Sequence, residues 1–369
     1  MKLLPLCFVM AASFSNGAFA ATYPNGATLY SAPPLAVLPS SPPSGTYTPA
    51  TMDSPGLQAA INAAANAGGG TVQLASGNYT LNTTVVPKSN VFITGAGQGV
   101  TFLNRGSSFV YPTGSTSPTW TGLIYSNNPS GGVHDIKFSA LSVNGALSDT
   151  QRASQWPGFY GVSIESDATV ANHNFRIQFS SVEIKNSGQG VECKGTTEVT
   201  LTNGWYHNNG GGNLFFHNVY FRRCGDITVD GILSNYSGAH GLKVAGGTSN
   251  YTNESSNVTV KNCTISNNDY CDGYFTGVAN MRLTNNTWKY AADLQDSTVT
   301  NGAGILLDKE GTVGCSTVDI VNNVIQNSWA YGIRMYSGDS VNIQGNRVNT
   351  NTTNYDVHAT NLTCDYNTL

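Results

Sequence analysis

The chain is poor in charged residues. Lys, Arg, Asp and Glu together make up only 10% of its 369 residues, and the formal net charge is −4. Exposed helical faces need charged side chains, so this composition argues against a helix-rich fold. The chain also lacks a basic excess, the electrostatic footprint of nucleic-acid-binding proteins, and we expect no nucleic-acid partner. Abundant Gly, Asn, Thr, Ser and Val instead favour turn-rich β-structure.

Long apolar runs are also missing, apart from one at the N-terminus. Residues 1–20 read as a signal peptide, with Lys2 at the charged start, an apolar core over Leu3–Ala12 and a small-x-small cleavage site at Ala18–Ala20. This run is too short to span a membrane, and no later stretch is long or apolar enough to do so. We therefore expect a secreted or periplasmic protein with no membrane association.

Cysteine is scarce, and its spacing excludes one kind of site. No pair shows a C-x-x-C spacing, which argues against zinc. After the signal peptide the chain has Cys193, Cys224, Cys263, Cys271, Cys315 and Cys364. An even number in an exported protein permits disulfides, whose pairing the sequence leaves open. Small inward-facing core residues are the alternative, Cys193 being one example.

One helix is expected, and it begins the folded domain. Residues 21–51 are rich in Pro, Ser and Thr and predict an extended arm. Ser54 is the expected N-cap, Pro55 suits the first turn, and Gly68–Gly70 ends the helix. Apolar residues recur at helical spacing at Leu57, Ala60, Ile61 and Ala64. Short alternating strands are expected next, over 71–74 and 79–81.

Downstream a short pattern of alternating apolar residues and Asn-containing turns repeats. Three copies lie at 257–268, 318–327 and 341–348, and a glycine that opens a third strand recurs at Gly190, Gly241, Gly273, Gly304 and Gly332. Such repeats bury their apolar faces only by stacking on their neighbours. Asn suits a left-handed turn and can form hydrogen-bonded ladders from rung to rung. The pattern predicts a stack of strand-turn rungs.

The stretch at 57–65, followed by Gly-Gly-Gly-Thr-Val-Gln-Leu-Ala-Ser-Gly-Asn-Tyr, resembles the N-terminal cap of the pectate-lyase-like superfamily. The later repeats resemble the parallel β-helix repeats of that superfamily, so the resemblance covers 52–369. It implies an all-β, right-handed, single-stranded parallel β-helix with an N-terminal amphipathic capping helix, which we expect to be a monomer. The superfamily includes polysaccharide lyases, glycoside hydrolases, uronan epimerases, esterases and phage tailspikes, so the activity stays open.

Aligning the repeating glycines predicts which side chains face outward. A groove for an acidic polysaccharide would need aromatic rings to stack on sugars and cations to meet carboxylates. The outward residues expected to bind substrate are Glu192, Lys194, Phe275, Arg334 and Tyr336, together with Arg223. Residues 205–243 are the densest chemical neighbourhood and hold three of the six histidines, His207, His217 and His240.

A lyase acting on a uronate polymer needs a base for the C5 proton, a cation for the carboxylate and an acid for the leaving oxygen. The expected base is Lys243 or His240. The cation expected to bind the carboxylate is Arg222 or Arg223, and the expected acid is Tyr236 or His217. A solvated lysine is the plainer interpretation of Lys243, and a turn histidine bonded to backbone is that of His240.

Other activities remain as alternatives on the same scaffold. A hydrolase would need two facing carboxylates, but the Asn-Thr-Asp element of polygalacturonases is missing and the His element precedes the acidic one. The Asp-Pro-His element of uronan epimerases is absent too, which counts against that identity. A non-catalytic glycan-binding adhesin is the third alternative. Asp269 and Asp272 are candidate ligands for Ca²⁺, the one cofactor considered, with local turn hydrogen bonds as their plainer role.

Overall fold

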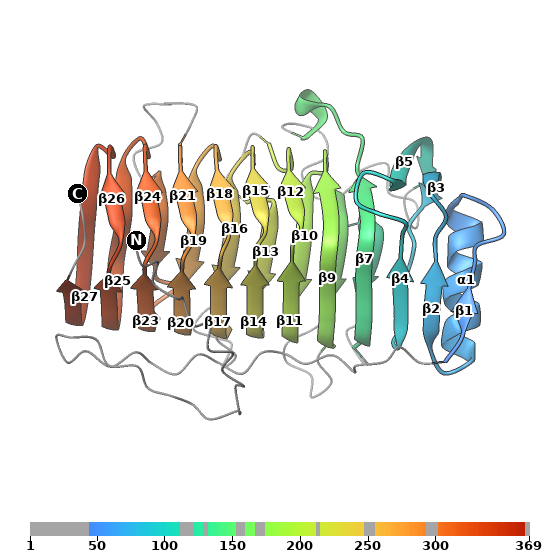
Figure 1. The fold of residues 1–369 in the computed structure, drawn as a ribbon, viewed down its shortest axis with the longest axis horizontal. Helices are drawn as coiled ribbons and strands as arrows, with labels where there is room; N and C mark the ends of the chain where they lie inside the picture. Colours follow the sequence, from blue (N-terminus) through green and yellow to red (C-terminus); the bar gives the residue numbers. More distant parts are fainter. Residues whose placement is uncertain are drawn as a thin grey trace, which may run out of the picture.

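The computed structural model describes residues 44–110, 121–127, 132–152, 159–166, 174–211, 215–246, 255–292 and 302–365. The expected signal peptide and most of the expected arm lie outside these residues. The described chain forms a parallel β-helix, with rungs stacked along the long axis of the molecule and helix α1 (Ser54–Asn66) across its N-terminal end (Figure 1). No helix among the described residues is long and apolar enough to cross a membrane.

Helix α1 closes the stack because one of its faces is apolar. Leu57, Ile61 and Ala64 are fully buried against the first strands, β1 (Thr46–Tyr47), β2 (Gly70–Gln73), β3 (Gly77–Thr83) and β4 (Val91–Thr94). The N-cap is Asp53 rather than the expected Ser54, and its carboxylate accepts a hydrogen bond from the amide of Gly56. Ser54 instead accepts from the amides of two residues of β3, which ties the helix to the stack.

The strands form one continuous parallel β-structure, in which the pairings between rungs define three sheets that run along the stack. The first contains β1, β2, β4, β7 (His134–Asn144), β9 (Asn174–Lys185), β11 (Thr196–Thr202), β14 (Gly225–Asp230), β17 (Ser255–Lys261), β20 (Val278–Thr284), β23 (Cys315–Val321), β25 (Tyr331–Gln344) and β27 (Thr353–Asp365). Because β1 already pairs with β2, the rungs begin within the segment expected to be the arm.

The second sheet contains β3, β5 (Thr101–Val110), the ends of β7 and β9, β12 (Trp205–His207), β15 (Leu233–Asn235), β18 (Thr264–Ser266), β21 (Thr287–Lys289), β24 (Val324–Gln326) and β26 (Arg347–Asn349). The third, which we call the site sheet, contains β6 (Thr121–Asn127), β8 (Phe159–Glu165), β10 (Gln189–Lys194), β13 (Val219–Arg222), β16 (His240–Ala245), β19 (Cys271–Thr276), β22 (Ala303–Asp308) and the start of β25.

The expected asparagine ladders are confirmed. The side-chain amide of Asn286 donates to the side-chain oxygen of Asn323 at 3.0 Å. The side-chain amide of Asn323 donates in turn to the side-chain oxygen of Asn346, also at 3.0 Å. Many other asparagines adopt positive φ at the corners, as Asn262 does at 57°. Five cysteines lie in the interior, namely Cys193, Cys224, Cys263, Cys271 and Cys315, and no disulfide forms within the described residues.

The repeating glycines predicted which side chains face outward, and at Gly273 this prediction is wrong by one residue. Leu242 pairs with Gly273, and Gly273 pairs with Ile305, so Gly273 occupies an inward position. Tyr274 therefore faces outward, and Phe275, expected to bind substrate, is fully buried inside the stack. The reason is space, because a Cβ at Gly273 would lie 2.6 Å from the ring of Trp288. A large core residue on β21 excludes a side chain on β19.

Candidate active site

The outer face of the site sheet carries charged, polar and aromatic side chains. They form two ladders of residues that are paired from rung to rung. The first ladder consists of Tyr125, Ser163, Glu192, Tyr220, Lys243, Tyr274, Leu306 and Arg334. The second consists of Asn127, Glu165, Lys194, Arg222, Ala245, Thr276 and Asp308. Equivalent positions on neighbouring rungs lie about 4.8 Å apart, which is close enough for adjacent side chains of a ladder to interact.

Two histidines lie beside the first ladder. His217 precedes β13 and His240 begins β16, and their rings lie 4.8 Å apart. Both are almost fully buried, and within the described residues neither ring nitrogen of His217 has a hydrogen-bond partner. Burial lowers the pKa of both rings well below 6.5, and the charge of Lys243 lowers it further. Both histidines are therefore uncharged at neutral pH.

His240 opens into a cavity of about 230 Å³. The cavity is lined by Phe215, His240, Lys243, Tyr270, Tyr274, Leu306, Asp308 and Tyr336. The ammonium of Lys243 lies 5.3 Å from the ring centre of Tyr220 and 5.0 Å from that of Tyr274. Burial lowers the pKa of Lys243, whereas Glu310 opposes that shift and the two rings favour the ammonium form.

Tyrosine hydroxyls complete the cavity. The ring of Tyr274 lies 4.7 Å from that of His240, and its hydroxyl donates a 3.3 Å hydrogen bond to Asp308. Tyr270 contacts His240 edge-on at 5.5 Å. Burial, and the nearby carboxylate of Asp308, raise the pKa of Tyr274. The cavity thus brings together a neutral base, a cation and protonated hydroxyls, the three groups that proton abstraction next to a carboxylate requires.

The structure brings several of the predicted catalytic residues together. His217, His240 and Lys243 cluster as described, and Arg222 lies next to Lys194 in the second ladder. Tyr236, the other candidate acid, does not join them. It follows β15 in a left-handed turn, is exposed, and does not line the cavity.

The predicted substrate-binding residues divide in the same way. Tyr336 lines the cavity, while Arg334 is sandwiched between Tyr331 and Tyr336 and pairs with Asp356 at 3.0 Å. Arg223 lies in a left-handed turn after β13, away from the first ladder. Glu192 and Lys194 face outward on β10, as expected from the glycine register.

The two candidate calcium ligands lie at the start of β19, Asp269 just before the strand and Asp272 within it. Asp272 takes the position that glycine holds in other rungs, is fully buried, and accepts a 2.8 Å hydrogen bond from Asn268. The described residues contain no group of three or more His, Cys, Asp or Glu side chains arranged to hold a metal ion. Calcium binding therefore stays a prediction.

Sequence reasoning missed several residues of this face. The shifted glycine at β19 hid Tyr274, and Tyr270 carries no pattern of its own. Glu165 and Tyr125 were missed because the predicted glycine register begins at Gly190, although Gly161 of β8 holds the equivalent position one rung earlier. The alternation of Ser163 and Glu165 around the buried Ile164 is the signal that could have placed them.

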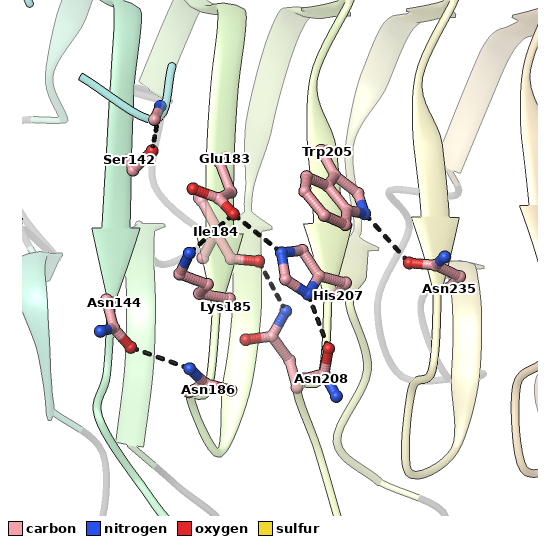
Figure 2. Close-up of polar contacts among 12 residues, drawn as sticks. Ser142, Asn144, Glu183, Ile184, Lys185, Asn186, Trp205, His207, Asn208 and Asn235 are labelled. Carbon is pink, nitrogen blue, oxygen red and sulfur yellow. Dashed lines mark hydrogen bonds and ion pairs between the residues drawn. The ribbon is translucent and has the colours of Figure 1, made fainter. Parts of the chain in front are cut away.

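A second polar network lies on the outer face of the second sheet (Figure 2). Glu183 accepts from Lys185 at 2.8 Å and contacts the ring of His207 at 2.9 Å, and the indole of Trp205 stacks on that ring. Burial alone would raise the pKa of Glu183, but hydrogen bonds from His207, Lys185 and Ser142 outweigh it and hold the pKa at about 2. This network is fully bonded, which fits a structural role.

Comparisons with solved structures agree on the fold. The mannuronan C-5 epimerase AlgE4 A-module of Azotobacter vinelandii superposes with a TM-score of 0.60 at 19% identity, covering 81% of this chain and 74% of that one. The surface adhesin PfbA of Streptococcus pneumoniae gives a TM-score of 0.59 at 17% identity, covering 84% and 77%. At these identities the likeness establishes the fold alone.

The sequence itself places the chain in a family. It is 31% identical over 169 residues to Alginate lyase 7 of Azotobacter vinelandii, a match covering 43% of this chain and 18% of that protein. The chain thus spans about a fifth of that relative. Residues 47–274 match the sequence profile of the rhamnogalacturonase A/epimerase, pectate lyase-like family. The parallel β-helix, its capping helix and this match over more than half of the chain show that it belongs to the rhamnogalacturonase A/epimerase family of pectate lyase-like proteins.

Proposed function

We propose that this protein is a secreted polysaccharide lyase that cleaves a uronate-containing glycan by β-elimination. The observation that carries the proposal is the buried, uncharged His240 in a cavity beside Lys243. Within the described residues its Nδ1 is buried and has no hydrogen-bond partner, so the fold does not use the hydrogen-bonding capacity of this nitrogen. The similarity to a protein named an alginate lyase supports the same class of substrate.

The reaction follows from these groups. Lys243 binds the sugar carboxylate and stabilises the negative charge that develops beside it. His240 accepts the C5 proton, the C5–H electron pair forms the C4–C5 double bond, and the C4–O bond breaks. Tyr274 donates a proton to the departing oxygen, so that charge and protons balance. The low pKa of His240 keeps this base unprotonated at neutral pH.

The test is the ultraviolet absorbance of the unsaturated uronate formed from alginate, pectate and glycosaminoglycans. His240→Ala should lower the rate by about 10²-fold or more, and Lys243→Ala by about 10²-fold. Matched controls are His134→Ala and Lys289→Ala, which lie on other sheets and should keep the parent rate. Thermal unfolding of each variant confirms that it folds.

Other outcomes would identify a different function. New reducing ends without new absorbance would mean hydrolysis, and exchange of the C5 hydrogen in D₂O without cleavage would mean epimerisation. Binding of the glycan with none of these signals would indicate an adhesin. Full activity in both the His240 and Lys243 variants would show that the reaction takes place elsewhere on the chain.

A further inference from the structure

A second group of charged side chains lies on the site sheet, towards its N-terminal end. Glu165 and Glu192, which we call the carboxyl pair, come from neighbouring rungs of β8 and β10 and are each more than nine-tenths buried. Ser163 donates to Glu165 at 2.9 Å, and the ammonium of Lys194 lies 3.8 Å from the same carboxylate. Arg222 is the next residue after Lys194 in the second ladder.

Glu192 is protonated at neutral pH. Burial and the charge of Glu165 raise the pKa of Glu192 to about 8, although Lys194 and Arg222 oppose the shift. With Glu192 protonated, the group contains one carboxylate, Glu165, and two cations, Lys194 and Arg222, so its net charge is +1. A group of this charge attracts a carboxylate, and the protonated Glu192 can donate a hydrogen bond to it.

The surroundings of the pair point to a ligand. His217 lies between the pair and the cavity, beside Gln189, which donates to Glu192. Its ring is fully buried, yet neither nitrogen has a partner within the described residues. On the other side the rings of Tyr125 and Tyr160 lie parallel, 6.0 Å apart. Buried polar atoms without partners are rare in folded proteins and call for an explanation, of which a bound polar ligand beside them is one.

The spacing relates the pair to the cavity. In the first ladder Glu192 pairs with Tyr220, and Tyr220 with Lys243, so Glu192 and Lys243 lie two rungs, or about 10 Å, apart. A glycan lying along the stack would therefore pass both groups. Accepting the proposed function, we infer that the carboxyl pair, Lys194 and Arg222 form a second carboxylate-binding subsite, and that the substrate is a polyuronate that presents two carboxylates to this face at once.

The subsite makes binding depend on one proton. Above about pH 8 Glu192 ionises, and its charge then repels the sugar carboxylate. Charged and titratable groups from all neighbouring elements face Glu192 or act on it: Tyr125 on β6, Tyr160 and Glu165 on β8, Lys194 on β10, Tyr220 and Arg222 on β13, Lys243 on β16, and the buried thiols of Cys193 and Cys224. Substituting Glu192 alone separates its titration from theirs.

The test measures equilibrium binding of alginate to the full chain carrying His240→Ala, which prevents turnover, from pH 6 to pH 9.5. Affinity should fall about tenfold as pH rises through 8. Adding Glu192→Gln, an uncharged isostere, should remove most of that fall, so that the affinity of this variant at pH 9.5 stays close to its own affinity at pH 6. Adding Glu198→Gln, on another sheet, is the matched control and should leave the fall unchanged.

Two results would overturn the subsite: no fall in affinity around pH 8, or an equal fall with Glu192→Gln. The uronate monosaccharide should bind the parent and the Glu192→Gln chain far more weakly than alginate, because it cannot reach both groups. If the monosaccharide bound as tightly as one alginate binding site does, that result would also overturn the inference. These binding results do not depend on the reaction. A chain that fails the absorbance assay but shows the Glu192-dependent fall loses only the proposed lyase activity.

Discussion

His217 and His240 stack across neighbouring rungs, with ring centres 4.8 Å apart and ring planes inclined by 32°. Protonation of either ring would place a charge in a buried site beside the other ring and Lys243. Burial and the neighbouring Lys243 therefore keep both histidines uncharged, and this should affect both the stability and the activity of the protein.

The first prediction concerns acid stability. The folded-state pKa of His217 lies below the value of about 6.5 expected in the unfolded chain. As pH falls below 6.5, His217 therefore binds a proton more readily in the unfolded chain than in the folded one, and the folded state loses stability. His217→Phe removes this loss and two unpaired nitrogens. Urea unfolding should show the variant gaining stability over the parent as pH is lowered from about 7.5 to about 5, by about 1.4 kcal/mol for each unit of pKa difference. A constant difference would contradict the prediction.

The second prediction separates chemistry from packing at Tyr274. Tyr274→Phe keeps the ring beside Lys243 and His240 but removes the hydroxyl. We expect kcat to fall by about 10²-fold with KM nearly unchanged, because the proton donor is lost while the binding groups remain. Tyr290→Phe, at an exposed position after β21, is the control. An unchanged kcat for Tyr274→Phe would assign the acid to another residue, with Tyr270 the next to test.

The third prediction concerns the network of Figure 2. Glu183→Gln removes a charge that bonds to both Lys185 and His207, and should cost about 2 kcal/mol of unfolding free energy at neutral pH. Because the pKa of Glu183 is held at about 2, its contribution is present above pH 4.5 and disappears as pH falls towards 2. The deficit of the variant should therefore shrink in acid. A deficit that is the same at every pH would argue against a charge-based role.

The fourth prediction concerns the asparagine ladder. Asn323 is buried and bonds to Asn286, Asn346 and backbone groups. Asn323→Ala should cost about 2–4 kcal/mol, since several buried partners would be left unsatisfied. Asn349→Ala, which removes one half-buried contact with Gln326, should cost less than about 1 kcal/mol. Similar costs for the two variants would mean that the ladder adds no special stability.

The sequence alone was sufficient for the fold. The alternation of apolar residues, the recurring glycines and the asparagine turns indicate stacked rungs, because each feature is local and repeats with the rung. The apolar spacing of residues 57, 60, 61 and 64 likewise located the capping helix. The cap itself was misplaced by one residue, since both Asp53 and Ser54 can accept from a helix amide and only the packing against β3 assigns them different partners.

The candidate site depended on the tertiary structure. His217 and His240 were candidates because they lie near one another in sequence, but their burial, and with it their neutral state, comes from packing on the outer face of the site sheet. The side that Tyr274 and Phe275 face depends on Trp288, which lies fifteen positions after Gly273 and leaves no room for a side chain there. A one-residue shift in a strand exchanges its inner and outer faces. The sequence by itself therefore determined the stack, and only the packing between rungs decided which side chains meet in the cavity.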